Sequence, residues 1–191
     1  MAHPLVIVPG IGGSGADHWQ SRWEAALPGT LRIDPASWDE PELADWVAAV
    51  DRAVATSPAP PVLVAHSLGC LAVAHWAVRT DGASARIAGA FLVAPPDPAG
   101  AAFPAAAVTG GFALPGGPLG IPATVLASTD DPYAELARSA EVAAAWGAGF
   151  VELGARGHVN AASGLGEWPE GLQLLEDVAA TARREAGPPA A

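Results

Sequence analysis

The stretch of sequence that decides the fold is VLVAHSLG, from Val62 to Gly69, which leads into the helix-compatible run Cys70–Val78. An apolar run, a serine between small residues and a second apolar run are typical of a strand, a sharp turn and a helix. Residues 65–69 match the G-x-S-x-G pattern of a nucleophile elbow, with Ala65 in the place of the first glycine. The pattern predicts Ser67 as a nucleophile whose hydroxyl points clear of the sheet. The alternative is a buried serine that only caps the helix.

Apolar runs alternate with longer amphipathic stretches on both sides of this turn. This alternation is typical of βα units, and near-continuous apolar strands are typical of a parallel sheet that helices cover on both faces. We therefore expect an α/β fold, a three-layer αβα sandwich with a mostly parallel sheet of about six strands. The expected strands are residues 5–8, 31–33, 62–65, 90–93, 124–127 and 150–152, and the expected helices are residues 19–27, 42–54, 69–78, 133–146 and 168–184.

A serine hydroxyl is a weak nucleophile until a base takes its proton, and in this fold the acid and the histidine follow the serine in that order. The run STDDPY, with Asp130 and Asp131, follows one expected strand, and the run GARGHVN, with His158, follows the last one. The carboxyl ends of parallel strands meet at one edge of the sheet. The order predicts His158 as the base. Local chemistry leaves Asp130 and Asp131 as equal candidates for the acid, because adjacent side chains point in different directions.

Hydrolysis of an acyl bond also needs backbone N–H groups that stabilise an oxyanion. One such donor is expected from Leu68, directly after the serine, and the other from Ile11 in the loop PGIGGSG, residues 9–15. The same loop formally matches the dinucleotide-binding pattern G-x-G-x-x-G. A lone match is weak, and only Asp34 stands near the position of the acidic residue that would bind a ribose. We therefore favour an oxyanion loop.

Residues 95–122 are rich in Pro, Gly and Ala and have no sustained periodicity. Long segments of this kind are often functional. We expect a partly ordered rim over the site with a helical turn near residues 101–107; a plain connection between two strands is an equal alternative. Phe103, Phe112 and Leu114 are the candidate substrate contacts. A single domain is expected over residues 1–185, followed by a frayed tail at 186–191.

Composition excludes several functional classes. The chain has 191 residues and a formal net charge of −11, and it contains no lysine, which excludes Schiff-base chemistry and disfavours a nucleic-acid partner. We find no secretory signal and no apolar run of membrane-spanning length, so no membrane partner is expected. One cysteine and five dispersed histidines form no metal-binding pattern. We expect a cytoplasmic protein without a metal ion, as a monomer or a dimer.

Several longer motifs extend these patterns over nearly the whole chain: VIVPG at 6–10, DHWQ at 17–20 with Trp23, AHSLG at 65–69, STDDPY at 128–133, GHVN at 157–160 and SGLGEWP at 163–169. Together they resemble the family of small serine hydrolases that includes retinoblastoma-binding protein 9 and the bacterial YdeN proteins. In that family the acid is the aspartate directly before the proline, which corresponds to Asp131. The resemblance also implies Ser67 as nucleophile, His158 as base and a minimal α/β-hydrolase fold without a separate cap domain.

The expected function is that of a carboxylesterase-like serine hydrolase. It would cleave an ester or related acyl bond of a small substrate through an acyl-enzyme, without an organic cofactor. Two alternatives stay open, because a fold does not determine a function. One is a non-catalytic binding or scaffold protein on the same fold, and the other is an amidase, thioesterase or acyltransferase with the same three residues.

Overall fold

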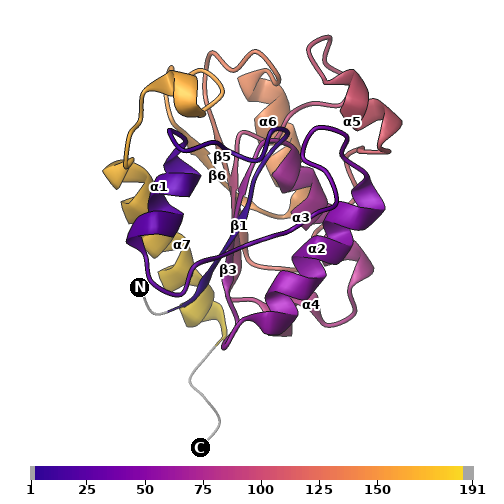
Figure 1. Ribbon diagram of the computed structural model, residues 1–191. Coiled ribbons are helices and arrows are strands. Elements are labelled where there is room, and N and C mark those ends of the chain that lie inside the picture. The colour runs from indigo at the N-terminus through magenta and orange to yellow at the C-terminus, as the bar shows by residue number, and fades with distance from the viewer. Residues whose placement is uncertain (1–2, 187–191) are drawn as a thin grey trace, which may run out of the picture.

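Short apolar runs form a six-stranded parallel sheet in the computed structural model, which describes residues 3–186 (Figure 1). Along the sheet the strands follow the order β2-β1-β3-β4-β5-β6, and every pairing between neighbours is parallel. This confirms the predicted α/β fold. The strands are β1 (Leu5–Val8), β2 (Leu31–Arg32), β3 (Val62–His66), β4 (Gly89–Val93), β5 (Ala123–Ala127) and β6 (Gly149–Glu152).

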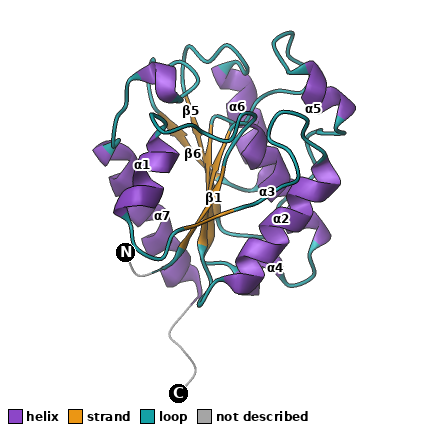
Figure 2. Cartoon of the chain, viewed as in Figure 1, coloured by secondary structure: helices purple, strands orange, loops and turns teal. Residues whose placement is uncertain are grey.

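Helices cover both faces of the sheet, as Figure 2 shows. The helices α1 and α7 lie on one face, and α2, α3 and α6 lie on the other. The short helix α4 and the 3-10 turn η1 are additions to the predicted elements. The bounds are α1 (Trp19–Ala26), α2 (Leu43–Thr56), α3 (Leu68–Arg79), α4 (Ala83–Arg86), α5 (Ala105–Thr109), α6 (Leu136–Trp146), η1 (Ala161–Ser163) and α7 (Pro169–Ala186).

Each central strand contributes to two hydrophobic cores, because successive side chains of a strand point to opposite faces. In β1, Val6 and Val8 belong to the core beneath α2, α3 and α6, whereas Leu5 and Ile7 belong to the core beneath α1 and α7. All four side chains are buried. The first strand is therefore central to the sheet, and both layers depend on it.

Three tryptophans dominate the core beneath α1 and α7. The ring centroids of Trp19 and Trp23 are 4.6 Å apart, and those of Trp19 and Trp168 are 5.0 Å apart. Each indole of α1 also donates a hydrogen bond to the distant end of the chain, from Trp19 to the carbonyl of Val159 (2.8 Å) and from Trp23 to that of Glu167 (2.7 Å). These contacts join α1 to the segment that carries the candidate base.

The segment 95–122 is anchored rather than loose. Its helical turn is α5, a few residues later than predicted. Phe112 packs edge-on against Trp46 of α2, with 5.4 Å between the ring centroids, and the carbonyl of Gly110 accepts a hydrogen bond from the amide of Leu43 (3.0 Å). The segment is therefore a rim that is packed on the first turn of α2.

Two predictions concern the chain ends and the membrane. The tail predicted at residues 186–191 begins at Ala186, the last residue of α7, and its remaining residues lie outside the described part of the chain. Within the described residues, no helix has the length and apolar character needed to span a bilayer.

Candidate active site

Ser67 occupies the sharp turn between β3 and α3. Its backbone has φ 54° and ψ −125°, a conformation that costs a non-glycine residue about 1–3 kcal/mol. Close backbone approach on both sides depends on glycine: a Cβ on Gly69 would lie 2.3 Å from the carbonyl oxygen of Val8, and one on Gly10 would lie 2.9 Å from the Cβ of Ser67. The Ser67 side chain makes no capping hydrogen bond to α3. The turn therefore presents its hydroxyl to the loops above the sheet.

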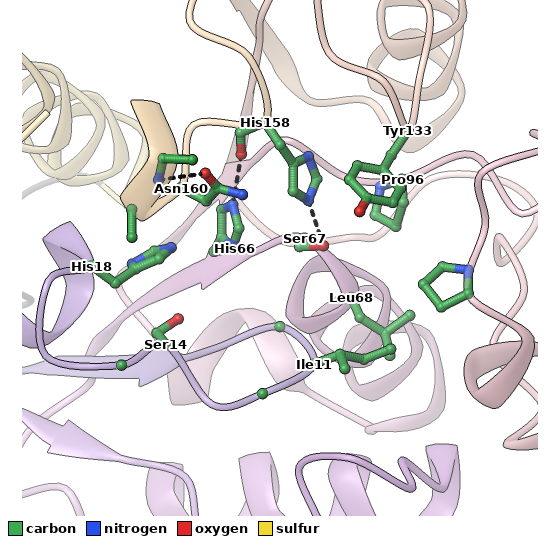
Figure 3. Close-up of a pocket in the computed structure, with 16 residues that line it drawn as sticks. Ile11, Ser14, His18, His66, Ser67, Leu68, Pro96, Tyr133, His158 and Asn160 are labelled. Carbon is green, nitrogen blue, oxygen red and sulfur yellow. Dashed lines mark hydrogen bonds between the residues drawn. The ribbon is translucent and has the colours of Figure 1, made fainter. Parts of the chain in front are cut away.

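Ser67, His158 and Asp131 form a continuous chain of hydrogen bonds. The Ser67 Oγ lies 2.8 Å from the His158 Nε2, and the His158 Nδ1 lies 2.9 Å from both carboxylate oxygens of Asp131 (Figure 3). A carboxylate only accepts hydrogen bonds, so Nδ1 carries the proton and Nε2 accepts from the serine hydroxyl. The side chains of His158 and Asp131 are only 9% and 3% exposed. His158, oriented by Asp131, can therefore take the proton of the Ser67 hydroxyl.

Asp130, the other candidate acid, is turned away from the imidazole and holds the loop before it. Its Oδ1 accepts hydrogen bonds from the amide of Gly157 (2.7 Å) and from the hydroxyl of Ser128 (2.7 Å). Ser128 Oγ in turn accepts from the amide of Arg156 (2.9 Å). The hydrogen bond from Ser128, and then that from Gly157, lower the pKa of the Asp130 carboxyl. The structure thus separates the two aspartates that local chemistry could not.

Two further histidine rings lie in a row beside the base, in tilted and edge-on contacts. His66 donates its Nε2–H to the carbonyl oxygen of His158 (2.9 Å), which fixes the loop that carries the base. The ring centroid of His66 is 4.9 Å from that of His158 and 4.7 Å from that of His18. Burial lowers the pKa of His66 well below its usual value, and burial followed by the charge of Arg32 lowers the pKa of His18 to about 4. Both rings are therefore neutral at neutral pH.

The loop after β1 is held beside the serine by Arg32 of β2. The Arg32 guanidinium donates to the carbonyl of Gly13 and to that of Ser14 (3.4 Å). Ile11 in this loop and Leu68, the first residue of α3, both line the cavity around Ser67. The first amides of a helix have no acceptor within the helix. Both predicted oxyanion donors thus lie on the elements that border the nucleophile.

A cavity of about 510 Å³ opens over Ser67. Apolar side chains from the rim and the first loop lie on one side of it, and His18, His66 and Asn160 lie on the other (Figure 3). The lining residues are Gly10, Ile11, Gly12, Ser14, Gly15, His18, His66, Ser67, Leu68, Pro96, Pro104, Tyr133, His158, Asn160, Ala161 and Ala162.

The predicted substrate contacts in the rim are wrong. Phe103 and Phe112 are buried in the core beneath α2 and α3, and Leu114 packs against the same core, so none of the three lines the cavity. The rim contributes Pro96 and Pro104 instead. Apolar side chains in an irregular segment gain more from burial in the core than from facing an open cavity.

Three residues that line the cavity were not among the predicted site residues. Tyr133 follows the acid by two residues, and its ring centroid is 4.3 Å from that of His158. Asn160 follows the base by two residues, and His18 precedes the first residue of α1. The sequence did hold a signal for Tyr133 and Asn160, because they lie in the turns that carry the predicted acid and the predicted base. The described residues hold no group of three or more His, Cys, Asp or Glu side chains placed to bind a metal ion.

Comparisons with known proteins identify a family and a shared fold. A family model described as serine hydrolase matches residues 5–177. A YdeN-like hydrolase from Pectobacterium atrosepticum is 32% identical over 94% of this chain and 91% of its own, with a TM-score of 0.82. The ydeN gene product of B. subtilis is 21% identical over 93% and 98% of the two chains, with a TM-score of 0.72. A type II thioesterase from the borrelidin biosynthetic cluster, 16% identical over 93% of each chain with a TM-score of 0.66, shares the fold. A comparison with curated protein sequences found no significant match.

Proposed function

The chain belongs to the serine hydrolase family, and we propose that it cleaves a carboxylic ester of a small molecule through Ser67, His158 and Asp131. The observation that carries this proposal is the unbroken run of hydrogen bonds from the Asp131 carboxylate through the His158 ring to the Ser67 hydroxyl. Burial of the acid and the base supports it further, because a buried ion pair with a developing imidazolium is little screened by water.

In the proposed reaction, His158 Nε2 takes the proton of Ser67 as the Oγ attacks the carbonyl carbon of the substrate. The resulting oxyanion accepts hydrogen bonds from the backbone amides of Ile11 and Leu68. His158 then gives its proton to the departing alcohol oxygen, which leaves an acyl-enzyme on Ser67. A water molecule, deprotonated by the same Nε2, then attacks the acyl carbon, and Nε2 returns the proton to the Ser67 Oγ as the bond from Oγ to the acyl carbon breaks and the acid is released. Asp131 holds the ring in the tautomer that each of these steps needs.

The cavity supports a neutral substrate. None of its lining residues is an Asp, Glu or Arg, and the net charge of −11 repels anions from the surface. The reaction uses only side chains, backbone amides and water.

We also propose a cytoplasmic setting, which is supported by the single cysteine, Cys70, a free and buried thiol.

Labelling with a fluorophosphonate probe tests the proposal. The wild-type protein and Ser84→Ala, a change at an exposed serine of α4, should label and should hydrolyse 4-nitrophenyl butyrate. Ser67→Ala should not label, and its turnover should fall by roughly 10⁴- to 10⁶-fold. Labelling or full turnover of Ser67→Ala contradicts the assignment, and a folded wild-type protein that does neither favours a binding protein. Parallel rates on short esters, thioesters and anilides identify the acyl bond.

A further inference from the structure

His18 has a ring nitrogen whose hydrogen-bonding capacity the protein does not use. Its Nδ1 accepts a hydrogen bond from the amide of Gln20 (3.2 Å) and thereby caps α1. A neutral imidazole has one acceptor and one donor nitrogen, so the proton lies on Nε2. This Nε2 is buried and has no hydrogen-bond partner among the described residues. Buried polar groups are almost always paired, so an unpaired one calls for an explanation.

Asn160 shows the same arrangement on the opposite loop. Its Oδ1 accepts a hydrogen bond from the amide of Ala162 (2.9 Å) and caps the turn η1. A backbone amide can only donate, which fixes the oxygen of the side chain on that side and leaves the NH₂ group on the other. Two backbone amides therefore orient two side chains so that each is left with N–H donors.

Both side chains border the cavity over Ser67. His18 is only 4% exposed, and it lines the cavity together with Asn160. Figure 3 shows them on the same side of Ser67, next to His66, whereas Tyr133 and Pro96 lie on the other side. The two side chains thus border one end of the cavity, whereas Pro96 and the ring and hydroxyl of Tyr133 lie at the other end.

The charge around this polar end favours a neutral acceptor. The His18 ring is neutral at neutral pH, because burial and the nearby Arg32 hold its pKa at about 4. Burial also lowers the pKa of His66, so this neighbouring ring is neutral as well. Neither ring offers a full positive charge to a carboxylate or a phosphate. A neutral oxygen can accept a hydrogen bond here without bringing a charge out of water.

We propose that His18 and Asn160 form a polar subsite that binds a neutral oxygen of the substrate, so that the protein prefers esters with an ether, carbonyl or hydroxyl oxygen close to the scissile bond over hydrocarbon esters of the same size. The subsite rests on the proposed esterase function and names its substrate class. His18 contributes the buried Nε2–H, and Asn160 contributes its NH₂ group from the loop that carries the base.

Two pairs of matched esters test the subsite. In each pair one CH₂ group is replaced by oxygen: 4-nitrophenyl methoxyacetate against 4-nitrophenyl butyrate on the acyl side, and 2-methoxyethyl acetate against butyl acetate on the alcohol side. The readout is the ratio of kcat/KM within a pair. Intrinsic differences in ester reactivity cancel when this ratio is compared between the wild-type protein and a variant.

Three variants separate the donor from the capping role. His18→Ser keeps a side-chain acceptor for the cap of α1 but loses the ring, whereas His18→Phe keeps a ring but loses the cap. The one feature that both variants lack is the Nε2–H donor, so a loss shared by both is due to that donor. His3→Ser makes the same change at a histidine outside the cavity lining, whose Nδ1 lies 3.2 Å from the carbonyl of Pro60. Thermal unfolding identifies the folded variants, and one folded His18 variant suffices.

In at least one pair, the preference for the oxygen ester should fall by roughly 2- to 10-fold in the His18 variants, the factor that one neutral hydrogen bond supplies. Asn160→Ser should lower the same ratio, and His3→Ser should leave it unchanged. Ratios equal to the wild-type value in both pairs, in a folded His18 variant, overturn the subsite while the esterase function stands. A wild-type protein that neither labels with fluorophosphonate nor cleaves the hydrocarbon esters overturns the function and the subsite together.

Discussion

Replacing Gly69 with alanine should destabilise the protein, although it places a better helix former in α3. A Cβ at this position would lie 2.3 Å from the carbonyl oxygen of Val8 and 2.5 Å from that of Pro9. Both oxygens belong to backbone, and the side chain of Val8 is completely buried. No flexible side chain can move aside, so α3 and the end of β1 must separate by several tenths of an ångström.

Two opposing effects set the magnitude. Alanine in place of glycine within a helix is worth about 1 kcal/mol. Overpacking of a well-packed interior costs about 1–3 kcal/mol, and contact with rigid backbone falls at the upper end of that range. The net expectation is a loss of about 2 kcal/mol in the free energy of unfolding. For a domain of this size that loss lowers Tm by about 4–8 °C.

Thermal unfolding followed by circular dichroism measures this loss. Gly116→Ala is the matched control, because a Cβ there meets no atom within 4 Å and the backbone does not require a positive φ. Turnover of 4-nitrophenyl butyrate should also fall in Gly69→Ala, since the loop that carries Ile11 continues directly from Pro9. A Tm equal to or above the wild-type value would refute the close approach of α3 and β1.

Three further outcomes are expected. Asp131→Asn should lower kcat by roughly 10³- to 10⁴-fold because it favours the wrong tautomer of the base, whereas Asp130→Asn should lower it far less; equal losses would contradict the assignment of the acid. The free energy of unfolding should fall as the pH drops from about 6.5 to about 4, because the unfolded chain binds a proton at His18 before the folded protein does. Denaturant titrations at several pH values should show that this fall is smaller in His18→Ser, and an equal fall would contradict the lowered pKa of His18. Trp19→Phe should cost about 1 kcal/mol and lower kcat, since the carbonyl of Val159 beside the base loses its donor; an unchanged Tm and kcat would argue against this link.

The strands and the convergence of three loops could be predicted from the sequence because local signals carry them. Apolar runs of strand length mark the sheet, and the order of Ser67, Asp131 and His158 places their loops at one edge of it. The choice between Asp130 and Asp131 could not be made locally, because it depends on which carboxylate faces the ring and which faces the amide of Gly157. Only the family resemblance indicated the arrangement that the structure shows.

The lining of the cavity was less predictable because it depends on tertiary packing. Phe103 and Phe112 look like candidate contacts in a segment that lies near the site, yet contact with Trp46 and its neighbours draws them into the core. The expected order of serine, acid and histidine pointed only to residues after Ser67, so it gave no signal for His18 beside the cavity. Its place beside the cavity depends on how α1 packs next to the site, which the predicted start of that helix at residue 19 does not reveal.

The indoles of α1 have a consequence for synthesis on the ribosome. Trp19 and Trp23 emerge early, but their acceptor carbonyls on Val159 and Glu167 emerge about 140 residues later. A nascent chain therefore carries the serine turn long before the imidazole that activates it or the carbonyls that α1 needs. Both indole hydrogen bonds of α1 and the arrival of His158 therefore wait for the last part of the chain to be synthesised, and until then Ser67 has no base.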